Sequence, residues 1–140
     1  MVSVLQNVAI DCADAYELAR FWSGVTGRPL HPEDEPGDRE TQVMLAEGPV
    51  LYFNQVPEAK TAKNRIHLCL RPETSREEEV ERLLGLGATL VADLRNPDGS
   101  GWAVLADPEG NEFCVLRSES DRAAPQGPQR SGAAVVSHPS

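Results

Sequence analysis

The stretch WAVLADPEGNEFCVL, residues 102–116, has the pattern of a β-hairpin. The turn-forming letters DPEGN separate two apolar runs, which is typical of a strand, a tight turn and a second strand. Because side chains alternate between the two faces of a strand, Glu112, Cys114 and Leu116 share one face and Phe113 lies on the other. The sequence therefore places a carboxylate and a thiol on the same face of the last strand.

The segments before this hairpin alternate between strand and helix patterns. Helix starts are predicted at Asp14 and Ser75, because each is followed three residues later by a glutamate, as in a capping box. Gly27 and Gly87 stand where these helices should end. The other strand-like segments are residues 3–12, 41–48, 49–56, 65–72 and 88–94. The order strand, helix and three strands is therefore predicted twice.

The two halves are related by a shift of 60 residues, which indicates an internal repeat. The shift superposes apolar strand residues on each other, and it pairs Asn7 with His67 and Asn54 with Cys114. The apolar side chains of each first strand must face a helix, so Asn7 and His67 face away from it. Two curved sheets, each with a helix on its convex face, would leave a concave face lined by these more polar residues. The pattern thus predicts a pocket.

One folded domain is expected over residues 1–117. Its modules span about 3–56 and 65–117, joined by a linker at 57–64. Residues 118–140 are rich in Ser, Pro, Gly and Ala and show no period, so we predict a disordered tail.

Composition excludes several classes of function. The formal net charge of −9 argues against a nucleic-acid partner, since such proteins concentrate Lys and Arg. No apolar run approaches the roughly 20 residues that a membrane span needs. Three cysteines, an odd number, occur without a recognisable export signal, which predicts reduced thiols and a cytoplasmic protein.

Three stretches of the repeat resemble a known group of proteins: NVAIDCADAYELARFW, LYFNQVPEAKTAKNRIHLCL and WAVLADPEGNEFCVL. They are similar to the vicinal oxygen chelate superfamily, and within it to the glyoxalase and bleomycin-resistance-like proteins of the actinobacterial-type glyoxalase-like branch. The resemblance implies an α+β fold of two βαβββ modules, which form a half-open curved β-barrel around a small-molecule site. It also implies a homodimer.

The resemblance implies four positions for metal ligands, on the first and last strands of the modules. Metal-dependent members use His, Glu or Gln there, whereas this chain has Asn7, Asn54, His67 and Cys114. Carboxamides are weak ligands and a thiolate selects a softer metal, so only His67 suits a hard divalent ion. We therefore predict no resident metal and no other cofactor, and zinc on His67 and Cys114 is the fallback.

Candidate site residues follow from the predicted concave face. Tyr52 and Trp102 are candidate walls of the pocket, because an aromatic ring at a sheet mouth can stack on a ligand. His67 and Glu112 are the candidates for acid–base catalysis, and each also has a purely structural interpretation. The predicted ligand-binding residues are Asn7, Tyr52, Asn54, His67, Cys69, Trp102 and Cys114.

Three functions compete at this point. The first is a small-molecule-binding protein that sequesters a metabolite or drug-like ligand in a metal-free site. The second is a metal-dependent isomerase, lyase or dioxygenase of the glyoxalase type, and the third is a metal-free enzyme with His67 as acid or base. The sequence does not decide whether the protein is an enzyme, because function depends on the site and not on the fold.

Overall fold

The structure is a computed structural model, and it describes residues 1–123. The chain divides into two compact units, Met1–Thr61 and Ala62–Ser140, which we call unit 1 and unit 2 and describe separately. The predicted disorder of residues 124–140 lies outside the described residues.

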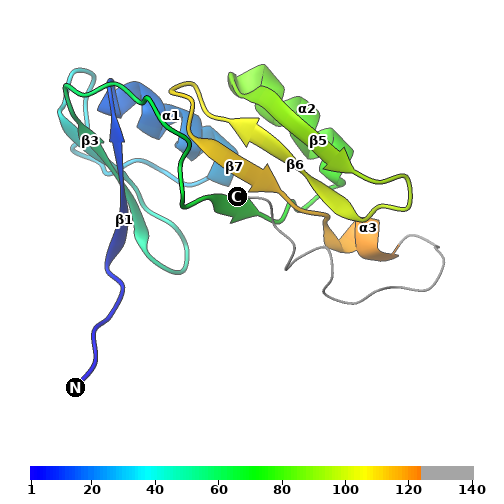
Figure 1. The fold of residues 1–140 in the computed structure, drawn as a ribbon. Helices are drawn as coiled ribbons and strands as arrows, with labels where there is room; N and C mark the ends of the chain where they lie inside the picture. The colour runs from blue at the N-terminus through cyan, green and yellow to red at the C-terminus, as the bar shows by residue number, and fades with distance from the viewer. Residues whose placement is uncertain (124–140) are drawn as a thin grey trace. The chain divides into compact units, whose positions relative to one another are not determined.

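Unit 1 has a three-stranded mixed sheet covered by one helix (Figure 1). Its elements in chain order are β1 (Asn7–Cys12), α1 (Ala15–Thr26), β2 (Glu40–Val43) and β3 (Val50–Gln55). The strand order is β1-β3-β2, in which β3 runs parallel to β1 and antiparallel to β2.

Helix α1 begins and ends where the sequence predicts. The Asp14 carboxylate accepts a hydrogen bond from the Glu17 backbone N–H at 3.1 Å, and Gly27 ends the helix at φ 69°. One face of α1, including Leu18 and Trp22, is buried against the sheet. Thr41 lies on the sheet face that α1 covers, because its hydroxyl donates a hydrogen bond to the Ala15 carbonyl at 2.7 Å.

The second strand that the βαβββ plan implies for each module is almost absent from unit 1. Only Leu30 occupies its place, in a single antiparallel bridge to Val43. Pro29 and Pro32 flank this bridge and have no N–H for a sheet ladder. The bridge therefore cannot extend in either direction, and the segment after it forms turns.

Unit 2 has a four-stranded sheet with the same connectivity and a complete second strand (Figure 1). Its elements are β4 (Leu68–Leu70), α2 (Arg76–Leu86), β5 (Thr89–Arg95), β6 (Gly101–Ala106), β7 (Glu112–Val115) and α3 (Glu119–Ala123). The strand order is β4-β7-β6-β5, with β4 and β7 parallel and the other pairs antiparallel.

Helix α2 is also capped as predicted. Ser75 accepts a hydrogen bond from the Glu78 N–H at 3.2 Å, and Gly87 ends the helix at φ 119°. Val80 and Leu83 are its most buried apolar residues. They lie outside the buried cluster around Cys114, so α2 covers the opposite sheet face, which carries the buried Phe113.

The folded part of the chain extends beyond the predicted boundary at residue 117. Ser118 is fully buried, and α3 follows it. The Asp121 carboxylate accepts hydrogen bonds from the backbone N–H of Ser118 at 2.8 Å and of Arg76 at 2.9 Å. Asp121 thereby satisfies an N–H of the first turn of α2, which ties α3 to the domain. The predicted tail of residues 118–140 therefore begins with a short helix, and disorder in its remainder stays a prediction.

The repeat is real, but its register in the first strands is shifted. Ile10 pairs with Phe53 in unit 1, whereas Leu68 pairs with Phe113 in unit 2. The shift that superposes the first strand of unit 1 on that of unit 2 is thus two residues shorter than the shift of 60 residues that superposes the last strands. The connection from the first strand to the helix compensates, because it is longer in unit 2 than in unit 1.

This shift corrects one predicted equivalence. His67 precedes Leu68 directly, so its counterpart in unit 1 is Ala9 and not Asn7. The pairing of Asn54 with Cys114 on the last strands is unaffected. The α+β fold class itself is confirmed, with two sheets that each remain open. Within residues 1–123, no helix has the length and apolar character that crossing a membrane requires.

Candidate functional site

In unit 1, the sheet face opposite α1 is polar, and we call it the polar face. Asp11, Asn54 and Glu40 are consecutive register partners across its three strands. The next row contains Tyr52 and Gln42. Directly opposed residues in a sheet have Cβ atoms about 5 Å apart, so these side chains are neighbours.

Hydrogen bonds connect the two rows of the polar face. The Tyr52 hydroxyl donates to the Glu40 carboxylate, and this bond raises the pKa of the Tyr52 phenol. The Asn54 side-chain amide donates to Asp11 Oδ1 at 3.5 Å. Within the described part of the chain, neither Asp11 nor Glu40 pairs with a Lys or Arg side chain. The face therefore presents hydrogen-bond acceptors and negative charge.

Asn7 shares this face but lies far from Asn54. Asn7 pairs with Val50, and Asn54 is four residues further along β3. At a rise of about 3.3 Å per residue, the two asparagines are roughly 13 Å apart. Tyr52 and Asn54 are thus brought together as predicted, and Asn7 stands apart from them.

In unit 2, the sheet face opposite α2 carries the two predicted cysteines. Cys69 of β4 pairs with Cys114 of β7, which pairs in turn with Val104 of β6. Trp102, Val104 and Cys114 form a buried cluster, with Leu116 packed against it. The common face predicted for Cys69, Trp102 and Cys114 is therefore observed.

Burial separates the two thiols. Cys69 is exposed, whereas Cys114 is 0% exposed. Desolvation raises the pKa of both thiols, that of Cys114 to about 12. The nearby Lys63 opposes the rise at Cys114. Cys114 thus lies beneath the face as a protonated thiol, and a ligand on the surface would meet Cys69 instead.

His67 lies in the loop before β4 and not within the strand. Its Nε2 atom is 3.0 Å from Lys63 Nζ and 3.2 Å from the Asn64 carbonyl oxygen. Nε2 accepts from Lys63 when it is deprotonated and donates to Asn64 when it is protonated. In both protonation states of Nε2, the imidazole stabilises the loop before β4.

Glu112 stabilises the same loop. Its carboxylate accepts a hydrogen bond from the Asn64 backbone N–H at 3.2 Å. The Asn64 side chain donates to Asn111 Oδ1 at 2.9 Å, and Asn111 is bonded to the buried Asp107 of the hairpin turn. The side chain proposed as an acid or base therefore has a visible structural role.

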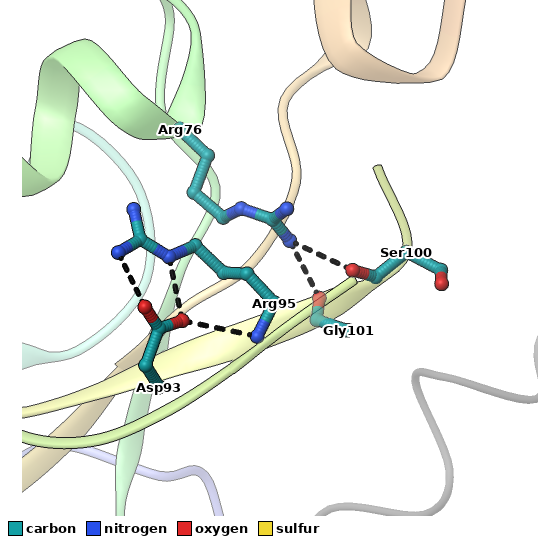
Figure 2. A network of polar contacts seen from close by, with 5 residues as sticks. All are labelled: Arg76, Asp93, Arg95, Ser100 and Gly101. Atoms are coloured by element: carbon teal, nitrogen blue, oxygen red, sulfur yellow. Dashed lines mark hydrogen bonds and ion pairs between the residues drawn. The ribbon is translucent and has the colours of Figure 1, made fainter. Parts of the chain in front are cut away.

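A buried guanidinium, that of Arg76, hydrogen-bonds the backbone of Ser100 and Gly101 (Figure 2). Arg76 is 5% exposed and donates to the carbonyl of Gly101 at 2.7 Å and of Ser100 at 3.4 Å. Burial lowers the pKa of Arg76. These bonds fix the backbone directly before Trp102, so α2 positions this end of the face.

The residues at the four metal-ligand positions do not fit a hard divalent ion. Asn7 and Asn54 are too far apart to share one ion, Nε2 of His67 is bonded within its loop, and Cys114 is a buried thiol. In residues 1–123, no three His, Cys, Asp or Glu side chains are grouped so that they could hold a metal. The fallback pair His67 and Cys114 has no third ligand of these types.

The sequence interpretation missed several contacts. Glu40 and Gln42 could have been found, because they alternate with the buried Thr41 and Val43. The contact of Lys63 with His67 spans an irregular loop and has no sequence signal.

Family comparison agrees with this fold. A family model described as a glyoxalase-like domain matches residues 7–116. No curated protein matches the chain.

Several solved structures share the fold. A glyoxalase/bleomycin resistance protein/dioxygenase family enzyme from Burkholderia phytofirmans PsJN has a TM-score of 0.62 and 20% identity, over 81% of this chain and 97% of that chain. A glyoxalase-related enzyme from Fulvimarina pelagi has a TM-score of 0.62 and 21% identity, over 85% and 90%. A fosfomycin resistance protein from Listeria monocytogenes, complexed with Mn(II) and a dihydroxypropylphosphonic acid, has a TM-score of 0.63 and 16% identity, over 87% and 96%. At these identities the similarity concerns the fold.

Proposed function

The chain belongs to the glyoxalase-like domain family, and we propose that it binds a small molecule at the polar face of unit 1 without a resident metal ion. The observation that carries this proposal is the row of Asp11, Asn54 and Glu40 beside Tyr52. These side chains lie on the sheet face opposite the core, and a cluster of polar groups there has no part in the packing against α1.

The chemistry of the face favours a ligand that offers hydrogen-bond donors. Asp11 and Glu40 are carboxylates, and the Tyr52 hydroxyl already donates to Glu40. The groups that the protein still offers to a ligand are therefore mainly hydrogen-bond acceptors. We propose an amine or a hydroxyl-rich molecule, with the Tyr52 ring as an apolar wall.

We propose that no metal is resident because of the side chains that occupy the four ligand positions of the family. A metal-dependent glyoxalase or dioxygenase reaction would need two or three good ligands, and the four family positions supply one imidazole that is bonded within its loop. Acid–base catalysis by His67 is the less favoured alternative, because Nε2 of His67 and the Glu112 carboxylate both contact the backbone of Asn64 in the loop before β4. His67, Cys69 and Trp102 in unit 2 remain proposed ligand contacts. A homodimer and a cytoplasmic location likewise remain predictions.

A test uses matched pairs of fragments, each an aromatic amine and the corresponding carboxylic acid. Backbone-amide NMR of the full chain should show the amines shifting Tyr52 and Asn54, and the acids leaving both unchanged. Tyr52→Phe removes one hydrogen-bonding group and should weaken amine binding roughly 2- to 10-fold. The control is Tyr16→Phe. It makes the same change at the other of the two tyrosines, which lies on α1, and should leave binding unchanged. Equal shifts by amines and acids, or equal effects of the two variants, would contradict the proposal.

A further inference from the structure

The two cysteines of unit 2 form a pair that belongs to a different unit from the polar face. Cys69 and Cys114 are direct register partners in neighbouring parallel strands, so their side chains project from the same face. The two thiols are close enough that each influences the pKa of the other. The only other cysteine, Cys12, belongs to unit 1, where its thiol donates to the Asn54 carbonyl at 3.6 Å.

The backbone spacing suits a covalent bridge. Adjacent strands lie about 4.8 Å apart, which falls within the range of about 4.4–6.8 Å between the Cα atoms of disulfide-bonded cysteines. β4 is only three residues long and lies at the edge of the sheet, so it has a neighbouring strand on one side only. Small adjustments of β4 can therefore bring the two sulfur atoms to bonding distance.

The two thiols differ in exposure, and this difference predicts which of them reacts first. Cys69 is exposed, and a reagent in solution can reach it, whereas Cys114 is fully buried beside it. We propose that Cys69 and Cys114 form a reversible intrachain disulfide by exchange with a small-molecule disulfide, with Cys69 as the attacking thiol and Cys114 as the resolving thiol.

The exchange is balanced in two steps. The Cys69 sulfur attacks one sulfur of the small disulfide, a mixed disulfide forms, and one small thiol leaves with the proton from Cys69. The Cys114 sulfur then attacks the Cys69 sulfur and displaces the second small thiol, which takes the proton from Cys114. Two protein thiols are oxidised, and one small disulfide is reduced to two thiols.

The environment predicts a slow and reversible reaction. Desolvation raises the pKa of both thiols, so little thiolate is present at neutral pH. Exchange should therefore accelerate as the pH rises. Because Cys69 is exposed, the disulfide should also be reduced more readily than a buried structural one.

The experiment uses the reduced full chain, incubated with oxidised glutathione at mildly alkaline pH. Remaining thiols are alkylated after denaturation and counted by intact mass, and the crosslinked peptides are identified after digestion. The wild type and Cys12→Ser should each lose two alkylatable thiols and yield a Cys69–Cys114 peptide. Cys69→Ser, a substitution at an exposed position, should form no intrachain disulfide.

Three outcomes would overturn the proposal. They are retention of all three thiols in the wild type, a stable glutathione adduct on Cys69 with Cys114 still alkylatable, and a disulfide between two chains. Since Cys69→Ser and Cys12→Ser decide the question, the result does not depend on how well a Cys114 variant folds. It is also independent of ligand binding at the polar face.

Discussion

Gly101 begins β6 in a conformation that other residues rarely adopt, and replacing it by alanine should strongly destabilise unit 2. Its φ is +83°, and a Cβ added there would lie 2.0 Å from the Leu94 carbonyl oxygen and 3.2 Å from Arg95 Cα. These atoms belong to the backbone of the paired strand β5, so the clash cannot be relieved by a side-chain rotation.

The expected cost has two parts. A residue with a Cβ in the left-handed region costs roughly 1–2 kcal/mol relative to glycine. Forcing the β5–β6 backbone apart adds about 1–3 kcal/mol, the usual cost of overpacking. The movement would also stretch the hydrogen bond of Arg76 to the Gly101 carbonyl (Figure 2). Gly101→Ala should therefore lower the free energy of unfolding by about 2–5 kcal/mol.

Urea unfolding followed by circular dichroism measures this cost, and Gly85→Ala is the matched control. Gly85 lies in α2, and a Cβ added there would meet no atom within 4 Å. An alanine at this helical position should stabilise the protein by roughly 0.5–1 kcal/mol. The two glycine variants should shift the urea midpoint in opposite directions. Equal midpoints would refute the conformation assigned to Gly101.

Two further substitutions, one of them with a matched control, test the core and a surface ion pair. Phe113→Ala should cost about 3–5 kcal/mol through a core cavity, because Phe113 is 1% exposed, whereas Ile66→Ala at a site 81% exposed should leave the urea midpoint unchanged. Asp93→Asn tests a pH dependence, because the hydrogen bond from Arg95 lowers the pKa of Asp93 to about 2 from 3.8. A lowered carboxylate pKa stabilises the fold above the unfolded value, and this contribution is lost as the pH falls from about 4 to 2. The side chain is 45% exposed, so Asp93→Asn should cost less than about 1 kcal/mol at neutral pH. The difference from wild type should vanish near pH 2, and a difference that grows on acidification would contradict the assignment.

Local signals predicted the helices well. The N-caps Asp14 and Ser75 and the C-terminal glycines Gly27 and Gly87 are where the sequence places them, since each cap depends on residues within one turn. The sheet faces were also predictable, because alternation with buried residues fixes the side of each strand.

Register was not predictable from the same alternation. A slip of two residues leaves every side chain on its original face. The apolar pattern therefore cannot decide whether the position equivalent to His67 in unit 1 is Asn7 or Ala9. Only the hydrogen-bonded partners of the last strands decide it.

Burial depth was the second limit. Cys114 alternates correctly with Phe113, but its complete burial depends on Trp102 and Val104 from β6. A bulky Cys114→Trp replacement would leave the fold intact if Cys114 lined an open pocket, but at this buried position it would overpack the cluster. The loop contacts of His67 with Lys63 and Asn64 are of the same kind, since they arise from tertiary placement without a periodic pattern.

The central claim is that the polar face around Tyr52 and Asn54 binds its ligand without a metal. Isothermal titration of the full chain with the best amine of the fragment pairs tests it, once in a chelating buffer and once with added Mn²⁺. We predict the same affinity and stoichiometry in both buffers, with weaker binding for Tyr52→Phe. Binding that appears only when the metal is present would contradict the account.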